Sequence, residues 1–171
     1  MDQEQFKRLA QGGAEVPVQE NKRHDAANRM VQASYVSLQS ALAFHGLIPE
    51  HVPTVTSMTT GRPRTWHTRL GDYVFSHIHK RWFWGYRKLD LGGSQQAFVA
   101  TPEKALLDLI HLESGGATVG YLKELRLQNL DRLNPEELEA QAVRSASPKL
   151  RRAVRLVSES VRAGLEEEQS L

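Results

Sequence analysis

The sequence predicts one α+β domain, in which a small, mostly antiparallel sheet is flanked by an N-terminal helix and a C-terminal group of about four helices. Three observations lead to this class. A helical pattern occupies residues 37–46, a stretch rich in Val, Thr and aromatic residues covers 52–100, and Pro-initiated helical patterns begin near 102, 135 and 148. Strands followed by a run of helices are typical of α+β folds.

Length and composition limit the class of protein. The 171 residues are 40% hydrophobic, which is enough for one core, and the chain contains no Cys. Disulfides, thiol catalysis and Cys-ligated metals are therefore excluded. We find no apolar stretch of membrane-span length and no signal peptide, so we expect a cytoplasmic protein. We divide the chain into a polar leader or linker (1–33), one α+β domain (34–165) and an acidic tail (166–171).

The first strong helical signal starts after Tyr35 and ends at Gly46. Ser37 is expected to cap the helix, and Leu38, Leu42 and His45 recur at helical spacing on one face. Gly46 suits the left-handed residue that ends a helix, and the Pro at position 49 prevents continuation. The leader before it has weak helical patterns at 2–11 and 20–31, without a strong apolar face.

The middle of the chain reads as strands. We expect a strand at 52–58 and a hairpin formed by 65–70 and 73–79, with Gly71-Asp72 as its two-residue turn. That register pairs Leu70 with Tyr73 and Trp66 with His77 on one face. An aromatic extended segment at 81–86 and a short strand at 96–100 complete the predicted sheet.

The second half of the chain reads as helices with clear start signals. Thr101 and Asn134 each precede a Pro and a Glu, as at a capped helix start. Helices are predicted to run from there to about 113 and 145, with another over 118–127. A last helix, 148–164, carries an apolar stripe beginning at Leu150 and a basic stripe formed by Arg151, Arg155 and Arg162.

Positive charge is concentrated in two regions, although the net charge is only +2. Residues 61–90 contain seven Lys or Arg against two Asp, and residues 144–162 contain six against one Glu. Seven of the twelve aromatic residues lie between Trp66 and Tyr86, so cations and rings alternate as in single-strand nucleic-acid binders. The simpler alternative is that the rings form core and the cations a solvated rim. The candidate partner- or nucleic-acid-binding residues are Arg62, Arg64, Arg69, Lys80, Arg81, Arg87, Lys88, Arg151, Arg155 and Arg162.

Five stretches in order resemble the AbiEi family of bacterial antitoxins. They are 35–42 (YVSLQSAL), 45–50 (HGLIPE), 55–64 (VTSMTTGRPR), 70–75 (LGDYVF) and 100–109 (ATPEKALLDL). The resemblance covers roughly residues 28–112. It implies an antitoxin that counteracts a cognate nucleotidyltransferase toxin, in a pair associated with phage defence, without catalysis of its own.

One feature departs from that family. Its typical members carry an N-terminal winged helix-turn-helix that represses their own operon, whereas only about 33 residues precede the matching region here. The chain is thus expected to be either trimmed to the antitoxin domain or a naturally short member. A DNA- or RNA-binding transcriptional regulator that uses a basic sheet or helix surface is the alternative function, and a cryptic enzyme that modifies its partner is the third.

Weaker patterns suggest other chemistry. His77 and His79 share a strand face that a metal could use, but nothing nearby completes a ligand set. Glu103, Lys104 and Asp108 resemble catalytic groups, although capping and solvent exposure explain them more simply. The helices on either side of residues 114–117 could mimic a helix-turn-helix that presents Lys123 and Arg126 to DNA. We therefore predict no catalytic residue, no metal and no cofactor.

Overall fold

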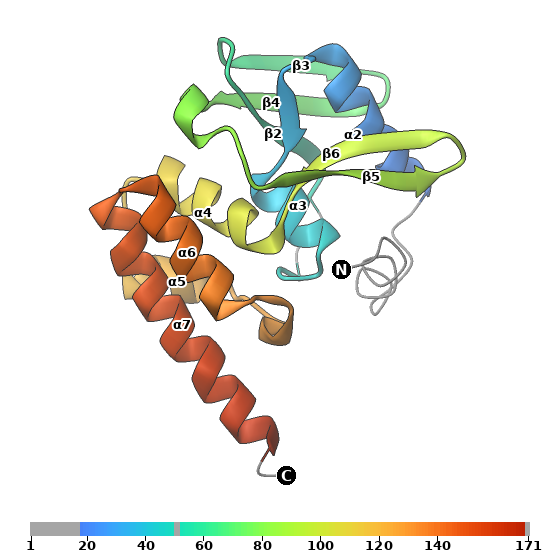
Figure 1. Ribbon diagram of the computed structural model, residues 1–171. Coiled ribbons are helices and arrows are strands. Elements are labelled where there is room, and N and C mark those ends of the chain that lie inside the picture. The colour runs from blue at the N-terminus through green and yellow to red at the C-terminus, as the bar shows by residue number, and fades with distance from the viewer. Residues whose placement is uncertain (1–17, 50–51, 170–171) are drawn as a thin grey trace.

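The computed structural model describes residues 18–49 and 52–169 and has the predicted α+β class (Figure 1). A six-stranded sheet occupies one end of the molecule, and most of the helices gather at the other. In chain order the elements are α2 (Val18–Met30), β1 (Ser34–Val36), α3 (Leu38–Phe44), β2 (Thr54–Thr59), β3 (Arg64–Thr68), β4 (Gly71–His77), the 3-10 turn η1 (Lys80–Trp82), β5 (Tyr86–Gly92), β6 (Gln95–Ala100), α4 (Pro102–Leu112), α5 (Val119–Glu124), η2 (Leu130–Arg132), α6 (Pro135–Ser145) and α7 (Pro148–Gln169).

The sheet is mixed, which corrects the expectation of a mostly antiparallel one. Its strand order is β3-β4-β2-β1-β6-β5. The pairs β3·β4, β1·β2 and β5·β6 are antiparallel, whereas β2·β4 and β1·β6 are parallel. The parallel pairs arise because the chain between each pair of strands contains other elements and re-enters the sheet in the same direction. Such connections leave no signature in the local alternation of residues.

The predicted hairpin exists, but its register is wrong. Trp66 pairs with Tyr73, not with His77, and the two-residue turn is Arg69-Leu70. The Thr68 hydroxyl stabilises this turn, since its oxygen accepts from the Leu70 N–H and it donates to the Gly71 carbonyl. The shift is an even number of residues, so Trp66 and Tyr73 remain on the face that the sequence assigned to them.

The aromatic segment 81–86 is not a strand, which is a second correction. Residues 80–82 form η1, capped by His79, whose Nδ1 accepts from the Arg81 N–H at 3.2 Å. The chain then turns through Gly85, whose φ is +78°, and β5 begins only at Tyr86. A left-handed residue at Gly85 interrupts any extended run.

The part of the expected leader or linker that the structure describes is docked on the main body, and the helix expected at 20–31 is α2. The helix α2 packs against β6, β1 and β2, with Ala27 and His24 buried. Asn28 links it to the sheet, because its side chain accepts from the Phe98 N–H at 2.7 Å and donates to the Ser34 carbonyl at 3.1 Å. The expected helix at 2–11 lies outside the described residues. At the other end, α7 continues to Gln169 and includes residues 166–169 of the expected acidic tail.

The predicted helix signals hold with one exception. Thr101 and Asn134 cap α4 and α6 with their side chains, and Gly46 ends α3 at φ +70°. Ser37 makes no cap bond, because the chain enters α3 through Leu38 at φ +57° and the Ser37 hydroxyl turns elsewhere. None of the described helices has the length and apolar composition of a membrane span.

The helix α4 joins the sheet to the C-terminal helices. It contacts α3, β6, α6 and α7, and all of its residues from Glu103 to Ile110 are buried. On α7 the predicted apolar stripe is likewise buried, whereas Arg151, Arg155 and Arg162 are exposed.

Candidate partner-binding surface

A buried polar network lies where α4 meets the sheet. The Asp108 carboxylate accepts hydrogen bonds from the Tyr35 hydroxyl and the Ser37 hydroxyl, each at 2.8 Å, and forms an ion pair with Lys104. Lys104 and Asp108 are 3% and 2% exposed. Both side chains are therefore buried, whereas the sequence analysis predicted that they would be exposed to solvent. A charged pair in this position needs its full set of partners, and here each oxygen of the carboxylate has at least one.

Glu103 is also buried, so none of the three side chains has the predicted solvent exposure. Its Oε1 accepts from the Asn134 N–H at 2.9 Å, so it ties the start of α6 to α4. Burial raises the pKa of the Glu103 carboxyl above its usual value. The three residues that resembled catalytic groups are thus occupied in holding segments of the chain together.

Trp84 carries the network outward to the surface. Two cations lie over its ring, with Lys104 Nζ 4.6 Å and Arg144 Cζ 4.4 Å from the ring centroid. Its indole N–H donates to the Arg81 carbonyl at 3.0 Å. Stacking of cations on an aromatic ring is attractive and orients them. Trp84 therefore fixes Arg144 of α6 beside the η1 segment.

Trp82 likewise connects η1 to α6 and α4. Its indole N–H donates to the Ser145 carbonyl at 3.1 Å, and its ring meets His111 edge-on at 4.2 Å. The Arg81 guanidinium lies 5.3 Å from the same ring. Partial burial lowers the pKa of His111 below its usual value. The two tryptophans together hold η1 against α4 and α6.

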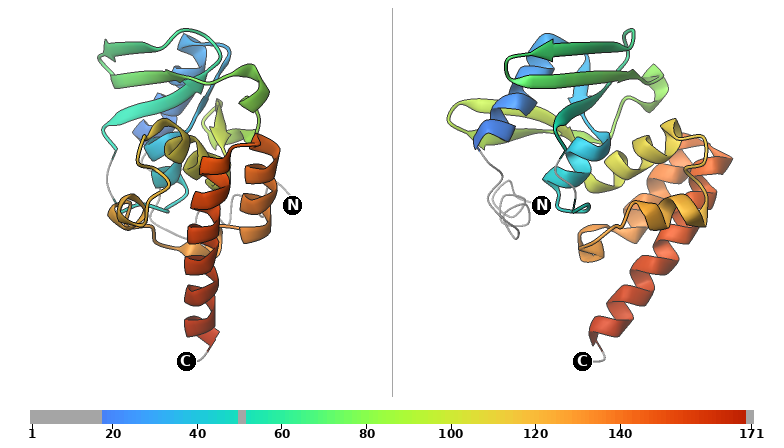
Figure 2. Two further views of the ribbon diagram at one scale, coloured as in Figure 1. Left: turned by 90° about the vertical axis from the view of Figure 1, so that its left-hand side faces the viewer. Right: turned by 180° about the vertical axis from the view of Figure 1, so that it is seen from behind.

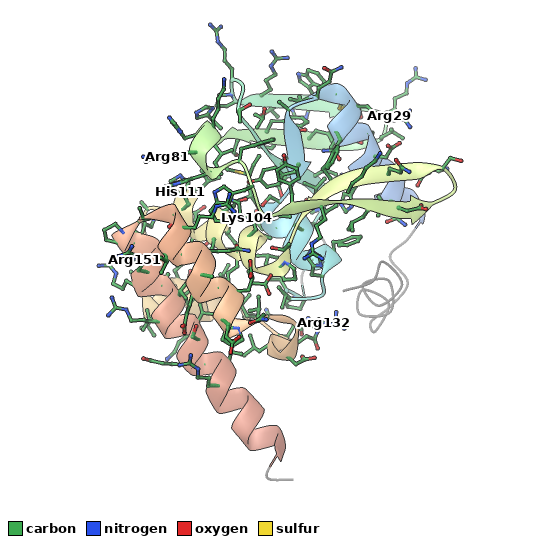
Figure 3. All side chains as sticks on the ribbon, in the orientation of Figure 1. Arg29, Arg81, Lys104, His111, Arg132 and Arg151 are labelled. Carbon is green, nitrogen blue, oxygen red and sulfur yellow. The ribbon has the colours of Figure 1, made fainter. Side chains whose placement is uncertain are left out.

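The outcome is an exposed cationic surface, which we call the basic face and define by Arg81, Arg144, Arg151 and Arg155. Figure 3 shows Arg81, His111 and Arg151 on one side of the molecule. Across the part of the chain that the structure describes, none of the four arginines forms a salt bridge. Four cations without carboxylate partners produce a positive field suited to an anionic partner.

The other predicted site residues lie apart from it. Arg62, Arg64 and Arg69 lie on or beside β3, at one edge of the sheet, whereas Arg87 and Lys88 lie on β5 at the opposite edge. Lys80 is exposed in η1, beside the basic face, and Arg162 pairs with Glu139 at 2.9 Å. One continuous basic sheet surface therefore does not form.

The aromatic residues of the hairpin do not line a surface. Tyr73 and Phe75 are buried and Trp66 is half-buried, with its ring packed against Phe75 at 6.1 Å. These rings belong to the core, as the simpler alternative proposed. Base stacking on the hairpin face is thus not available to a nucleic acid.

Two weaker patterns also receive a structural explanation. His77 Nδ1 lies 2.8 Å from the Gly61 carbonyl and His79 caps η1, and among the described residues no group of three potential ligands could hold a metal. The helix α5 ends at Glu124, so Arg126 follows it in a loop and does not share a recognition helix with Lys123.

The sequence analysis did not identify Arg144, Tyr35 or Ser37 as members of this region. One signal was present, since Lys104 and Asp108 are four residues apart on a helix and so share a face. Their partners are distant in sequence and could not be found in this way.

Comparisons of the chain with protein-family models, with curated proteins and with solved structures gave no match. The most distinctive feature of this α+β arrangement is a cationic surface held by two tryptophans over a buried ion pair.

Proposed function

We propose that this chain is an antitoxin of the AbiE type, which counteracts a nucleotidyltransferase toxin by binding it and without catalysis of its own. The observation that supports the proposal most strongly concerns the stretches 35–42 and 100–109, which carry the resemblance in sequence. They converge in space, because Tyr35 and Ser37 of the first bond to Asp108 of the second. Two of the five resembling stretches are thus joined directly in the folded chain.

The basic face gives the chain a surface for a partner. Arg81 and Arg144 are held by Trp82 and Trp84, so little side-chain freedom is lost when they bind. Tryptophan and arginine are the residues that most often dominate binding energy at interfaces. We infer that the toxin presents an acidic surface to these residues.

Co-expression tests the proposal directly. The chain is produced together with the nucleotidyltransferase encoded beside it, and relief of growth arrest is measured. Full relief is expected, together with a complex that survives gel filtration. Growth arrest that persists at equal expression of the two proteins contradicts the proposal. Intact-mass measurement of the toxin before and after incubation with the chain tests the absence of catalysis, and an unchanged mass is expected.

A transcriptional regulator that binds nucleic acid is the second candidate. It is favoured by the arginines of the basic face, which have no carboxylate partner in the described part of the chain. Binding to phosphates must weaken steeply as salt rises. A gel-shift series with operon DNA and with RNA between low and physiological salt therefore separates the candidates, and no shift at low salt eliminates this one.

A further inference from the structure

The segment 118–132 has apolar side chains that the rest of the chain only half covers. It forms α5, a loop and η2, and none of its residues, all of which the structure describes, is buried. Its large apolar residues are Val119, Tyr121, Leu122, Leu125, Leu127 and Leu130. Aliphatic residues are usually the most buried residues of a domain. The apolar surface that these side chains leave exposed is therefore available to a partner.

The segment is nevertheless held in one conformation. The Gln128 N–H donates to the Leu47 carbonyl at 2.9 Å, and the Asn129 amide donates to the Gly46 carbonyl at 2.7 Å. Arg126 and Asn129 have φ angles of +49° and +51°, a region that residues other than Gly rarely adopt. Hydrogen bonds to the end of α3 thus fix the path of the backbone, so the half-covered side chains belong to a preformed surface.

Together with α7, this segment encloses an apolar groove. The groove has a volume of about 560 Å³. Its apolar walls are formed by Val119, Leu122, Leu127 and Leu130 of the segment and by Leu156 and Val157 of α7. Figures 1 and 2 show α6 along the opposite side of α7. Val119, at the start of α5, is 52% exposed. The groove therefore lies between two helical walls and is accessible from solvent.

The polar side chains of the groove lie at its rims. Lys123 and Arg126 belong to the wall formed by the segment, Glu159 and Ser160 belong to the α7 wall, and all four are exposed. Sites for small molecules usually contain a few polar groups that converge on the ligand from within the pocket. An apolar floor with charged rims instead matches an amphipathic helix, whose apolar face enters the groove while its flanks meet the rims.

The charges around the groove favour an acidic helix. Arg152 lies one turn before Leu156 on α7, about 40° around the helix axis, so it continues the α7 wall of the groove. Lys123 and Arg152 form no salt bridge with any residue that the structure describes. Glu159 is the one acid among the described residues that line the groove. Each wall therefore offers a cation to a carboxylate.

We propose that the groove binds an amphipathic helix of a partner protein, with the apolar face of that helix in the groove and Asp or Glu on its flanks. The aliphatic walls bury its apolar side chains, and Lys123 and Arg152 pair with its acids. The groove is preformed, so ordering costs on binding are small. Neither Arg81 nor Arg144 takes part, so the inference does not depend on the proposed function.

Fluorescence anisotropy of the full chain with labelled synthetic peptides tests the proposal. The probe is a peptide of about 18 residues with Leu at helical spacing along one face and Glu on both flanks. Its control has Lys in place of each Glu. Saturable binding of the Glu peptide is expected, and the Lys peptide should bind at least tenfold more weakly. Equal binding of the two peptides, or no saturation by the Glu peptide up to roughly 1 mM, overturns the proposal.

Substitutions on the two walls locate the binding site. Val119→Glu and Leu156→Glu should each weaken binding of the Glu peptide at least tenfold. Val143→Glu is the matched control, because Val143 is 61% exposed on α6, outside the groove, and introduces the same charge. It should leave the affinity unchanged. Circular dichroism confirms that each variant is folded. Unchanged binding in the folded groove variants contradicts the assignment of the groove as the site.

Charge exchange tests the role of the rims with substitutions at exposed positions. Lys123→Glu/Arg152→Glu should reverse the preference, so that the Lys peptide binds more tightly than the Glu peptide. A preference that stays the same in this variant shows that the rims do not select the charge of the helix and overturns that part of the proposal.

Sedimentation of the full chain tests the alternative that a second copy fills the groove. The chain is expected to remain monomeric at the concentrations used for peptide binding. A dimer that Val119→Glu and Leu156→Glu both dissociate, and that the Glu peptide also dissociates, would assign the groove to a second copy and overturn the proposal.

Discussion

Tyr35 and Asp108 are joined by a buried hydrogen bond of 2.8 Å across 73 residues of sequence. The bond connects β1 in the centre of the sheet to α4, the helix that contacts both halves of the molecule. Burial and the neighbouring Asp108 carboxylate raise the pKa of the Tyr35 hydroxyl above its usual range, so the phenol stays protonated and donates. The sheet and the helical group are therefore coupled through one carboxylate.

Asp108→Asn is expected to destabilise the fold by about 3 kcal/mol or more, because it leaves the buried Lys104 ammonium without its counter-charge. Urea denaturation followed by circular dichroism measures the change. The double variant Lys104→Met/Asp108→Asn should lose less than the sum of the single losses, since it removes the unpaired charge. Glu124→Gln, at an exposed acid, serves as the control and should cost under about 0.5 kcal/mol. If Asp108→Asn lost no more stability than the Glu124→Gln control, the ion pair would not contribute to stability.

Trp84→Leu is expected to cost about 2 kcal/mol and Trp84→Phe distinctly less, because Phe keeps an aromatic face for Lys104 and Arg144 whereas Leu does not. Thermal unfolding of the two variants gives the comparison. Both lose the hydrogen bond from the indole N–H, so their difference isolates the contribution of the ring face. Equal losses would show that the cations do not interact with the ring.

Gly116→Ala is expected to destabilise the chain by about 1–3 kcal/mol, since a β-carbon there would lie 2.4 Å from the Ile110 carbonyl oxygen. Gly115→Ala is its matched neighbour, because nothing lies within 4 Å of a β-carbon at that position. That variant should be neutral or slightly stabilising. Thermal unfolding measures both variants. A larger loss of stability in Gly115→Ala than in Gly116→Ala would contradict the close approach of this turn to α4.

Stability should fall as the pH falls from about 6.5 toward 4. Burial lowers the pKa of His24 and of His45 to about 4, against 6.5 for the unfolded chain. The native state thus binds fewer protons in this window, and the stabilisation that is complete above pH 6.5 is lost on acidification. The loss approaches roughly 3 kcal/mol per histidine at pH 4.

The raised pKa of Glu103 acts in the opposite direction and offsets part of this loss. Urea denaturation at pH 7 and pH 5 measures the slope. His45→Gln should reduce this slope by about half, because it removes one of the two titrating histidines. Gln is chosen because its amide can still donate to the Ala100 carbonyl, as the His45 ring does at 2.7 Å. An unchanged slope in that variant would assign the pH dependence to other groups.

Charge reversal should show that the basic face contributes to toxin binding and that the cations at the sheet edge do not. Arg81→Glu/Arg144→Glu is expected to weaken toxin binding at least tenfold and to reduce relief of growth arrest, because it reverses charge at the centre of the proposed interface. Arg62→Glu/Arg64→Glu, just before and at the start of β3, is the control with the same change in net charge and should retain relief. Equal effects of the two pairs would indicate a general response to net charge.

Local patterns in the sequence were sufficient for much of the secondary structure. The start of α4 at Thr101 and of α6 at Asn134 follows from side chains that bond the backbone within three residues, and the end of α3 follows from Gly46. The two stripes of α7 were predicted for the same reason, since helical periodicity places residues on faces. Even the hairpin faces were right despite the wrong register, because a shift by an even number of residues preserves them.

Only the tertiary structure decided which residues form the candidate surface. The residues near Asp108 in the sequence do not indicate that its carboxylate is buried, because its partners Tyr35 and Ser37 lie more than 70 residues away in the chain. The sheet order likewise separated Arg64 from Arg87, and the packing of α6 brought Arg144 onto Trp84. Start signals and periodicity are properties of neighbouring residues and so belong to the sequence. Burial of a charge, and the gathering of cations on one side, depend on contacts that exist only once the chain has folded.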